Sequence, residues 1–323
     1  MNIKKSLSNA FQDFSIGKHL LPTIIVIIVI VFIDIAAILL GVTLFAESIV
    51  KNKIDTAALR LKGTVDVTYE EINFNLLKFN TSIKNLKIAP TGKKDGVNID
   101  LITIYDFDRK NEIPTNLNIV ANGINIKVNN QMLNQTMPFL TALGFNNLNG
   151  NIELNYQYDA VKKDINLIKL SASIDKIGAI DIASHLGNLN LALFDNPVTI
   201  IMSLPNILLY SAEINFTDSA FLNRLIKLFA EKNNTSPELQ MNIFITKIDE
   251  QFANATDDYS KKSITTLKKF INNPDKISIK VNPKRTISLG LLKEIEYAKL
   301  PELLSLEITA PEKSAPKSAE IKK

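Results

Sequence analysis

The segment IELNYQY (Ile152–Tyr158) places an apolar residue at every second position and a polar residue between each pair. Successive side chains of an extended strand point to opposite faces, so this segment predicts a strand with one apolar and one polar face. The same alternation occurs at Val65–Tyr69, at Ile72–Leu76 and at Ile165–Ile174. A chain with this pattern favours an antiparallel sheet with one face buried and the other in water.

Further extended segments bring the prediction to roughly ten strands, almost all joined by hairpins. They are Ile83–Ile88, Val97–Tyr105, Leu117–Val128, Ile177–Ile182, Leu189–Leu193 and Leu208–Phe216. Within Leu117–Val128, the dipeptide Asn122-Gly123 predicts a two-residue hairpin turn, because both residues tolerate a positive φ. A helix is expected over Gln131–Leu143, with Pro138 limiting it to a short or kinked piece.

The periodicity changes from two to 3.6 after Thr217, which predicts a helical segment late in the chain. Asp218 is expected to cap a first helix, Ser236-Pro237 to open a second, and a third to cover Asp258–Ile271. The expected buried residues of the second helix are Met241, Ile245, Ile248 and Phe252. A strand at Ile277–Val281, a short helix at Leu289–Tyr297 and a last strand at Leu304–Ile308 follow. The predicted fold class is α+β, mainly antiparallel β, with a curved sheet or groove and a late helical segment.

One long apolar run, Leu20–Ala46, precedes the strands and contains a single ionisable residue, Asp34. About 20 apolar residues in a helix cross the ~30 Å hydrocarbon layer, so this run predicts a transmembrane helix. A cleaved signal peptide is the alternative, but its apolar region is only about 7 to 15 residues long. The expected organisation is a cytoplasmic N-terminus (1–19), a transmembrane helix (20–46), a helical stalk (47–62), an antiparallel β body (63–216), a helical segment with closing strands (217–309) and a disordered tail (310–323).

Asp34 lies near the middle of the apolar run. A carboxylate at a helix centre costs about 2.5 to 3.5 kcal/mol on insertion scales, which the neighbouring Ile and Val residues can outweigh. Two interpretations stay open. In the first, Asp34 is simply tolerated, because it is protonated in lipid or because the helix shifts so that it lies nearer an interface. In the second, Asp34 forms a hydrogen bond of roughly 0.6 to 2 kcal/mol with a polar residue of another transmembrane helix. The second interpretation makes Asp34 an intramembrane contact with a protein partner.

The composition speaks against catalysis, metal binding and nucleic-acid binding. Only four of the 37 basic residues are Arg, at a net charge of +4, and there is no Cys or Trp. No His or carboxylate cluster has metal-ligand spacing, no glycine motif cradles phosphate, and no cofactor is expected. Ser184 and His185 are adjacent, so in a strand they point to opposite faces and do not form a nucleophile and base. The pairs Glu70-Glu71, Asp106 with Asp108, and Asp257-Asp258 are expected in turns and helix caps. The chain is therefore expected not to be an enzyme.

Lysine pairs recur at helical spacing around an apolar stripe, at Lys261-Lys262 and at Lys268-Lys269. A solvated helix face is the default interpretation, and contact with anionic lipid headgroups is the sharper alternative.

The segment INFNLLKFNTSIKNLKIA (Ile72–Ala89), with a weaker echo in LSASIDKIGAIDIASHLGNLNLAL (Leu170–Leu193), resembles the opening of the AsmA-like proteins of Gram-negative envelopes. The segment FTDSAFLNRLIKLFAEKNNTSPELQ from Phe216 looks like the C-terminal part of membrane-anchored proteobacterial proteins. The resemblance implies an inner-membrane anchor and a curved antiparallel sheet that forms an apolar groove, in a group linked to envelope lipid handling. It implies no catalytic residues.

The expected function is that of a single-pass protein of the bacterial inner membrane, with its body in the periplasm and a β groove that binds or presents lipid or another apolar ligand. The charges that flank the apolar run are nearly balanced, so the orientation rests on the ease with which long domains translocate. The alternative is a membrane-anchored scaffold or assembly factor that binds other envelope proteins through its late helices.

Overall fold

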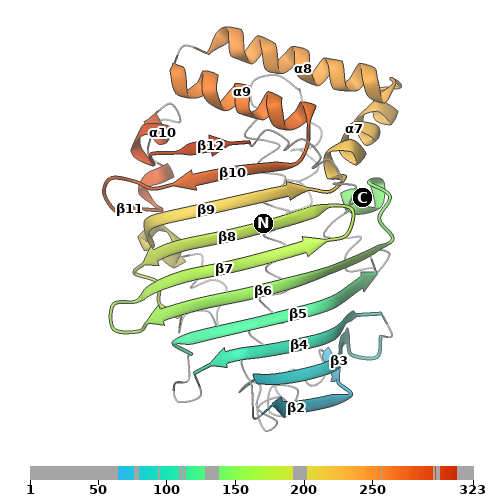
Figure 1. The fold of residues 1–323 in the computed structure, drawn as a ribbon, viewed down its shortest axis with the longest axis vertical. Helices are drawn as coiled ribbons and strands as arrows, with labels where there is room; N and C mark the ends of the chain where they lie inside the picture. Colours follow the sequence, from blue (N-terminus) through green and yellow to red (C-terminus); the bar gives the residue numbers. More distant parts are fainter. Residues whose placement is uncertain are drawn as a thin grey trace, which may run out of the picture.

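A computed structural model of the chain describes residues 65–310, with gaps at 76–79, 94, 109–110, 112–113, 128–137, 192–201, 256, 294 and 296–298. These residues form one open antiparallel sheet with helices gathered toward one end (Figure 1). The expected α+β fold with mainly antiparallel strands is confirmed. The predicted N-terminus, transmembrane helix and stalk, together with Asp34, lie outside the described residues, as does the predicted tail after Ala310. Among the described helices, none combines the length and apolar composition needed to cross a bilayer.

The sheet is a meander in which each strand from β3 to β9 pairs with the strand before it. The order is β1-β3-β4-β5-β6-β7-β8-β9-β10-β12, while β2 pairs with β3 and β11 pairs with β9. The strands are β1 (Val65–Thr68), β2 (Glu71–Asn75), β3 (Asn80–Pro90), β4 (Val97–Phe107), β5 (Asn116–Lys127), β6 (Asn147–Asp159), β7 (Asp164–Ile174), β8 (Gly178–Gly187), β9 (Leu208–Asp218), β10 (Lys276–Val281), β11 (Ile287–Ser288) and β12 (Glu307–Thr309). The closing strands β10 and β12 therefore extend the same sheet as the β body.

The predicted hairpin at Asn122-Gly123 is wrong, because β5 runs through this dipeptide as one strand. Gly123 has a φ of +66°, and a Cβ on it would lie 2.1 Å from a carboxylate oxygen of Asp100 on β4. The pairing of β5 with β6 shifts register between Ala121 and Ile124, so Gly123 lies in a β-bulge. The same positive φ that suits a hairpin turn serves a bulge here.

The prediction of two strands at Ile177–Ile182 and Leu189–Leu193 also needs correction. A single strand, β8, continues through His185 to Gly187, and residues 189–191 lie outside any strand. Residues 192 and 193 are outside the described part of the chain. Asp181 and His185 lie at alternating positions of β8 and are half-buried, so these polar residues do not interrupt the strand.

The helices are α5 (Pro138–Ala142), α7 (Phe221–Lys232), α8 (Pro237–Asn254), α9 (Asp258–Asn272) and α10 (Leu300–Leu303), with 3-10 turns η2 (Leu204–Asn206) and η3 (Leu291–Lys293). Ser236 caps α8 as expected, accepting from the N–H of Leu239 at 3.2 Å.

The expected inward position of Phe252 is wrong: Phe252 is 42% exposed and Phe244 is buried instead. Where a helix was expected at Leu289–Tyr297, the described residues form only the 3-10 turn η3. Pro138 begins α5, while the predicted helical residues before it lie outside the described chain.

Aromatic contacts fix the helices to the sheet and to each other. Phe270 of α9 meets Phe216 of β9 edge to face, with ring centroids 6.2 Å apart. Phe229 of α7 meets Phe244 of α8 in the same way at 5.7 Å. Their side chains join one hydrophobic core with the apolar residues of the strands. The chain thus leaves the sheet after β9, forms three helices that pack at its end, and returns as β10.

Two aspartates at helix N-termini have pKa values shifted in opposite directions, which gives a test of this region. Burial raises the pKa of Asp218, although its carboxylate accepts from the N–H of Leu222 in α7. By contrast, hydrogen bonding from the N–H of Ser260 lowers the pKa of Asp257, which caps α9 and is exposed.

We expect the variants Asp218→Asn and Asp257→Asn to show opposite pH dependence of stability. A raised folded pKa contributes stability below the unfolded pKa of about 3.9, and that stability is lost as pH rises through the folded pKa. Asp218→Asn should therefore gain stability relative to the native protein as pH rises from about 4 to 7. Asp257→Asn should lose relative stability as pH rises from below the folded pKa to about 5, because a lowered folded pKa contributes stability that is complete only above the unfolded pKa. Denaturant unfolding at several pH values measures both, and slopes of the same sign would contradict the assignment.

Candidate functional site

The apolar face of the sheet carries two rows of side chains, one from β2 to β10 and one from β3 to β12, which are apolar except for Thr81. Register places the members of each row directly opposite one another on successive strands. The first row is Ile72, Ile83, Ile102, Ala121, Ile152, Ala172, Ile180, Phe216 and Ile277. The second row is Thr81, Ile104, Ile119, Leu154, Leu170, Ile182, Ile214, Ile279 and Ile308. We call these two rows the apolar track; at about 4.8 Å per strand it is roughly 40 Å long.

Burial is uneven along the track. The first row is buried nearly throughout, as are Ile104, Ile119 and Leu154 of the second row on β4 to β6. Four members of the second row, on β7 to β10, are only half-buried: Leu170, Ile182, Ile214 and Ile279. The track is therefore closed over β4 to β6 and less completely covered where it approaches the helical end.

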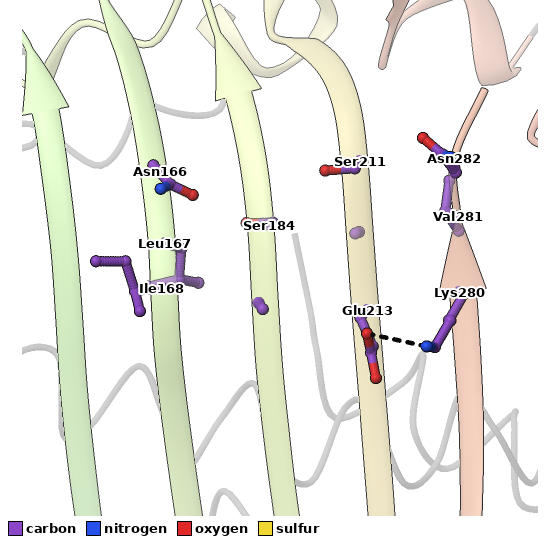
Figure 2. Close-up of a pocket in the computed structure, with 11 residues that line it drawn as sticks. Asn166, Leu167, Ile168, Ser184, Ser211, Glu213, Lys280, Val281 and Asn282 are labelled. Atoms are coloured by element: carbon purple, nitrogen blue, oxygen red, sulfur yellow. Dashed lines mark ion pairs between the residues drawn. The ribbon is translucent and has the colours of Figure 1, made fainter. Parts of the chain in front are cut away.

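The opposite, polar face has a hollow of about 500 Å³ over β7 to β10 (Figure 2). Ala183 of β8 lines this hollow and lies opposite Glu213 of β9. Lining residues of this hollow include Asn166, Ile168, Ser211, Glu213, Lys280 and Asn282. Ile168 is the extra residue of a β-bulge, because β7 shifts register at this point against both β6 and β8.

The charges of the hollow are paired. Glu213 lies across from Lys280, with 3.5 Å between Oε2 and Nζ, and it accepts from the Asn215 side chain at 3.0 Å. The hydrogen bond from Asn215, with a smaller contribution from Lys280, lowers the pKa of Glu213. A carboxylate held in its charged form is a poor general acid at neutral pH. The hollow therefore offers hydrogen-bonding groups and one ion pair.

Ser184 and His185 are not brought together. Ser184 lies opposite Leu167 and Ala212, in phase with the apolar face. His185 lies opposite Asn166 and Ser211, and its ring packs against Tyr210 with centroids 4.4 Å apart. The pair does not provide a nucleophile with its base.

The carboxylates that the sequence singled out have structural partners. Glu71 pairs with Lys84 of β3 at 2.8 Å, and Asp106 accepts from Asn116. Asp108 holds the turn between β4 and β5 by accepting from Thr115 Oγ1 at 2.8 Å. In the part of the chain that the structure describes, no three His, Asp or Glu side chains gather as metal ligands.

Sequence reasoning identified the apolar alternation but missed the track and the hollow. Both depend on register, which a single strand does not carry. One signal for the hollow was present: the small pairs Ala183-Ser184 and Ser211-Ala212 occur on strands that are consecutive in the chain.

A sequence profile of a family described as "Uncharacterized protein" matches residues 171–311. The match extends from the second half of β7 to the residue after Ala310, and so includes the helices α7 to α10 and three of the four half-buried members of the track, Ile182, Ile214 and Ile279. No curated protein matches the chain.

Proposed function

We propose that the chain is a membrane-anchored, non-catalytic binding protein of a bacterial envelope, whose sheet accommodates a lipid acyl chain or another apolar ligand along the apolar track. The observation that carries this proposal is the half-buried stretch of the track over β7 to β10, at Leu170, Ile182, Ile214 and Ile279. Aliphatic side chains in register on four neighbouring strands offer a continuous surface to an apolar chain, and burying such surface is favourable at about 25 cal/mol per Å².

The anchor and the location belong to the same proposal. The apolar run Leu20–Ala46 supports an inner-membrane anchor, and the resemblance of Ile72–Ala89 to AsmA-like proteins supports a periplasmic body that handles lipid. A track of roughly 40 Å is too short to bridge two membranes. The protein would therefore act as a shuttle, as one segment of an assembly, or by presenting lipid at the membrane surface.

Photo-crosslinking in cells tests the ligand. A diazirine-bearing aliphatic residue is placed in the full-length chain at Ile182, on the track, and as a matched control at Asp181, the preceding residue on the polar face. We expect a lipid adduct by mass spectrometry from position 182 and none from position 181. Equal lipid labelling at both positions, or only crosslinks within the chain from position 182, would contradict the proposal.

A protein-binding scaffold is the second candidate, and the surface of α8 favours it. Leu239 and Phe252 of this outer helix are 51% and 42% exposed, although both are large and apolar. Exposed apolar residues at a helix surface are typical anchors of protein interfaces. The same diazirine residue at Leu239 should then give one defined protein adduct, while position 182 gives none with lipid.

A further inference from the structure

Four large aliphatic side chains are exposed at one end of the strands. Val161 is 94% exposed at the tip of the β6–β7 hairpin, and Met202 is 72% exposed just before η2. Leu204 in η2 and Leu291 in η3 are each 40% exposed. Figure 1 shows the β6–β7 hairpin, the beginning of β9 and β11 along the same side of the sheet, at the left. We call these four residues the loop cluster.

Backbone hydrogen bonds hold the segments of the loop cluster together. The N–H of Gly290 donates to the carbonyl of Pro205 at 2.9 Å, and the N–H of Leu289 donates to Ile207 at 2.9 Å. These bonds place the residues next to Leu204 and Leu291 side by side. The N–H of Leu189 donates to the carbonyl of Lys163 at 2.8 Å, which ties the β6–β7 hairpin to the loop before β9.

In the described residues of the β6–β7 hairpin and the β10–β11 loop, basic residues outnumber acidic ones. The β6–β7 hairpin carries Lys162 and Lys163, and the β10–β11 loop on the same side carries Lys284 and Arg285. Against these four cations stand two carboxylates of the hairpin, Asp159 and Asp164, and Asp159 pairs with Lys162 at 3.4 Å. Aliphatic residues among lysines are the composition of surfaces that insert shallowly into a bilayer interface.

The length of the chain before β1 keeps this surface near a membrane. The predicted anchor ends at Ala46 and β1 begins at Val65, so residues 47–64 connect them. This connection spans roughly 60 Å when extended and ~27 Å as a helix. A strand of ten or eleven residues is about 35 Å long and the sheet is roughly 40 Å wide, so the connection in its extended form is long enough for the loop cluster to reach the bilayer.

We infer that the loop cluster is a second, peripheral membrane contact, which docks on the headgroup region of a lipid bilayer with a preference for anionic lipid. This inference rests on the proposed anchor, but it is independent of whether the apolar track binds lipid. Val161, Met202, Leu204 and Leu291 lie at the level of the acyl-chain boundary, while the lysines and Arg285 remain among the headgroups. Docking turns the ends of β6, β8 and β10 toward the membrane.

Tryptophan fluorescence tests the inference, because the chain contains no Trp of its own. Met202→Trp is the reporter, and Leu239→Trp on α8 is the control at a similarly exposed apolar position. The full chain is reconstituted in phosphatidylcholine vesicles with or without phosphatidylglycerol and with brominated acyl chains. We expect bromine to reduce the emission of the Trp at 202 about twofold, and the emission of the Trp at 239 hardly at all.

The charge reversal Lys162→Glu with Lys163→Glu, made in the Met202→Trp chain, should lower the quenching in anionic vesicles and leave it unchanged in neutral ones. Vesicle flotation separates the two proposals. If the chain floats with the vesicles but bromine does not quench the Trp at position 202, the anchor is supported and the inferred membrane docking of the loop cluster is overturned. A chain that does not float overturns both. Equal bromine quenching of the Trp at positions 202 and 239 also overturns the inferred docking of the loop cluster. So does an emission shift of the Trp at 202 without bromine quenching.

Discussion

Phe270→Ala should lower the free energy of unfolding by about 3 to 5 kcal/mol, the range for truncating a buried phenylalanine. Phe270 is buried in α9, and its ring meets Phe216 of β9 at 6.2 Å. Truncation removes this contact and leaves a cavity between the helices and the sheet. Because domains are typically stable by only about 5 to 15 kcal/mol, the loss is a large share of the total.

Denaturant unfolding of the full chain in detergent, followed by circular dichroism, measures this loss. Phe252→Ala is the matched control: it makes the same change in the same helical segment, at a side chain that is 42% exposed. Its effect should stay below about 1 kcal/mol. The double variant with Phe216→Ala should show coupling of roughly 0.5 to 1.5 kcal/mol, the value for an aromatic pair. Equal losses for Phe270→Ala and Phe252→Ala would contradict the packing of α9 on β9.

Gly150→Ala should cost about 3 kcal/mol, at the upper end of what overpacking a core usually costs. Gly150 lies on β6 beside the register shift against β5. A Cβ built on it would lie 2.1 Å from the carbonyl oxygen of Ser173 on β7, which is main chain and has no rotamer to adopt. The two strands would have to separate, and the hydrogen bonds between them would lengthen.

Gly92→Ala, in the turn after β3, separates this steric effect from conformational strain. Gly92 has a φ of +74°, but a Cβ there would have no heavy atom within 4 Å. Its substitution should therefore cost only the left-handed backbone penalty, roughly 1 to 2 kcal/mol. Gly150 does not have a positive φ, so a loss at position 150 no larger than the loss at position 92, measured by denaturant unfolding, would contradict the steric effect.

Local patterns predicted the strands well because the two faces of this sheet meet different environments. The alternation at Ile152–Tyr158 marks β6 correctly, and the period change after Thr217 marks the beginning of α7. The errors arose where one local signal serves two structures. Asn122-Gly123 suits a hairpin turn and a bulge equally, and only the partner strands β4 and β6 decide between them.

The candidate site was harder to predict, because its parts are distant in sequence. The apolar track joins Ile72 to Ile277 through strand register, and register is set by turn lengths and bulges along the whole meander. Phe252 shows the same limit for helices. Its spacing from Ile248 places it on the expected face of α8, but whether that face is covered there depends on the neighbouring elements.

The meander topology also bears on how the protein assembles while it is being made. From β3 to β9, each new strand finds its partner in the strand just before it, so pairing can proceed from the N-terminus as residues emerge from the ribosome or a translocation channel. Besides the edge at β1 and β2, the growing body then always has an unpaired edge at the strand formed last. This unpaired edge passes from strand to strand until β10, which follows the helices α7 to α9, pairs with β9 and β12 pairs with β10. Between the completion of β9 and the return of β10, the exposed edge of β9 is a place where a chaperone or a second nascent copy could pair with the chain by strand addition.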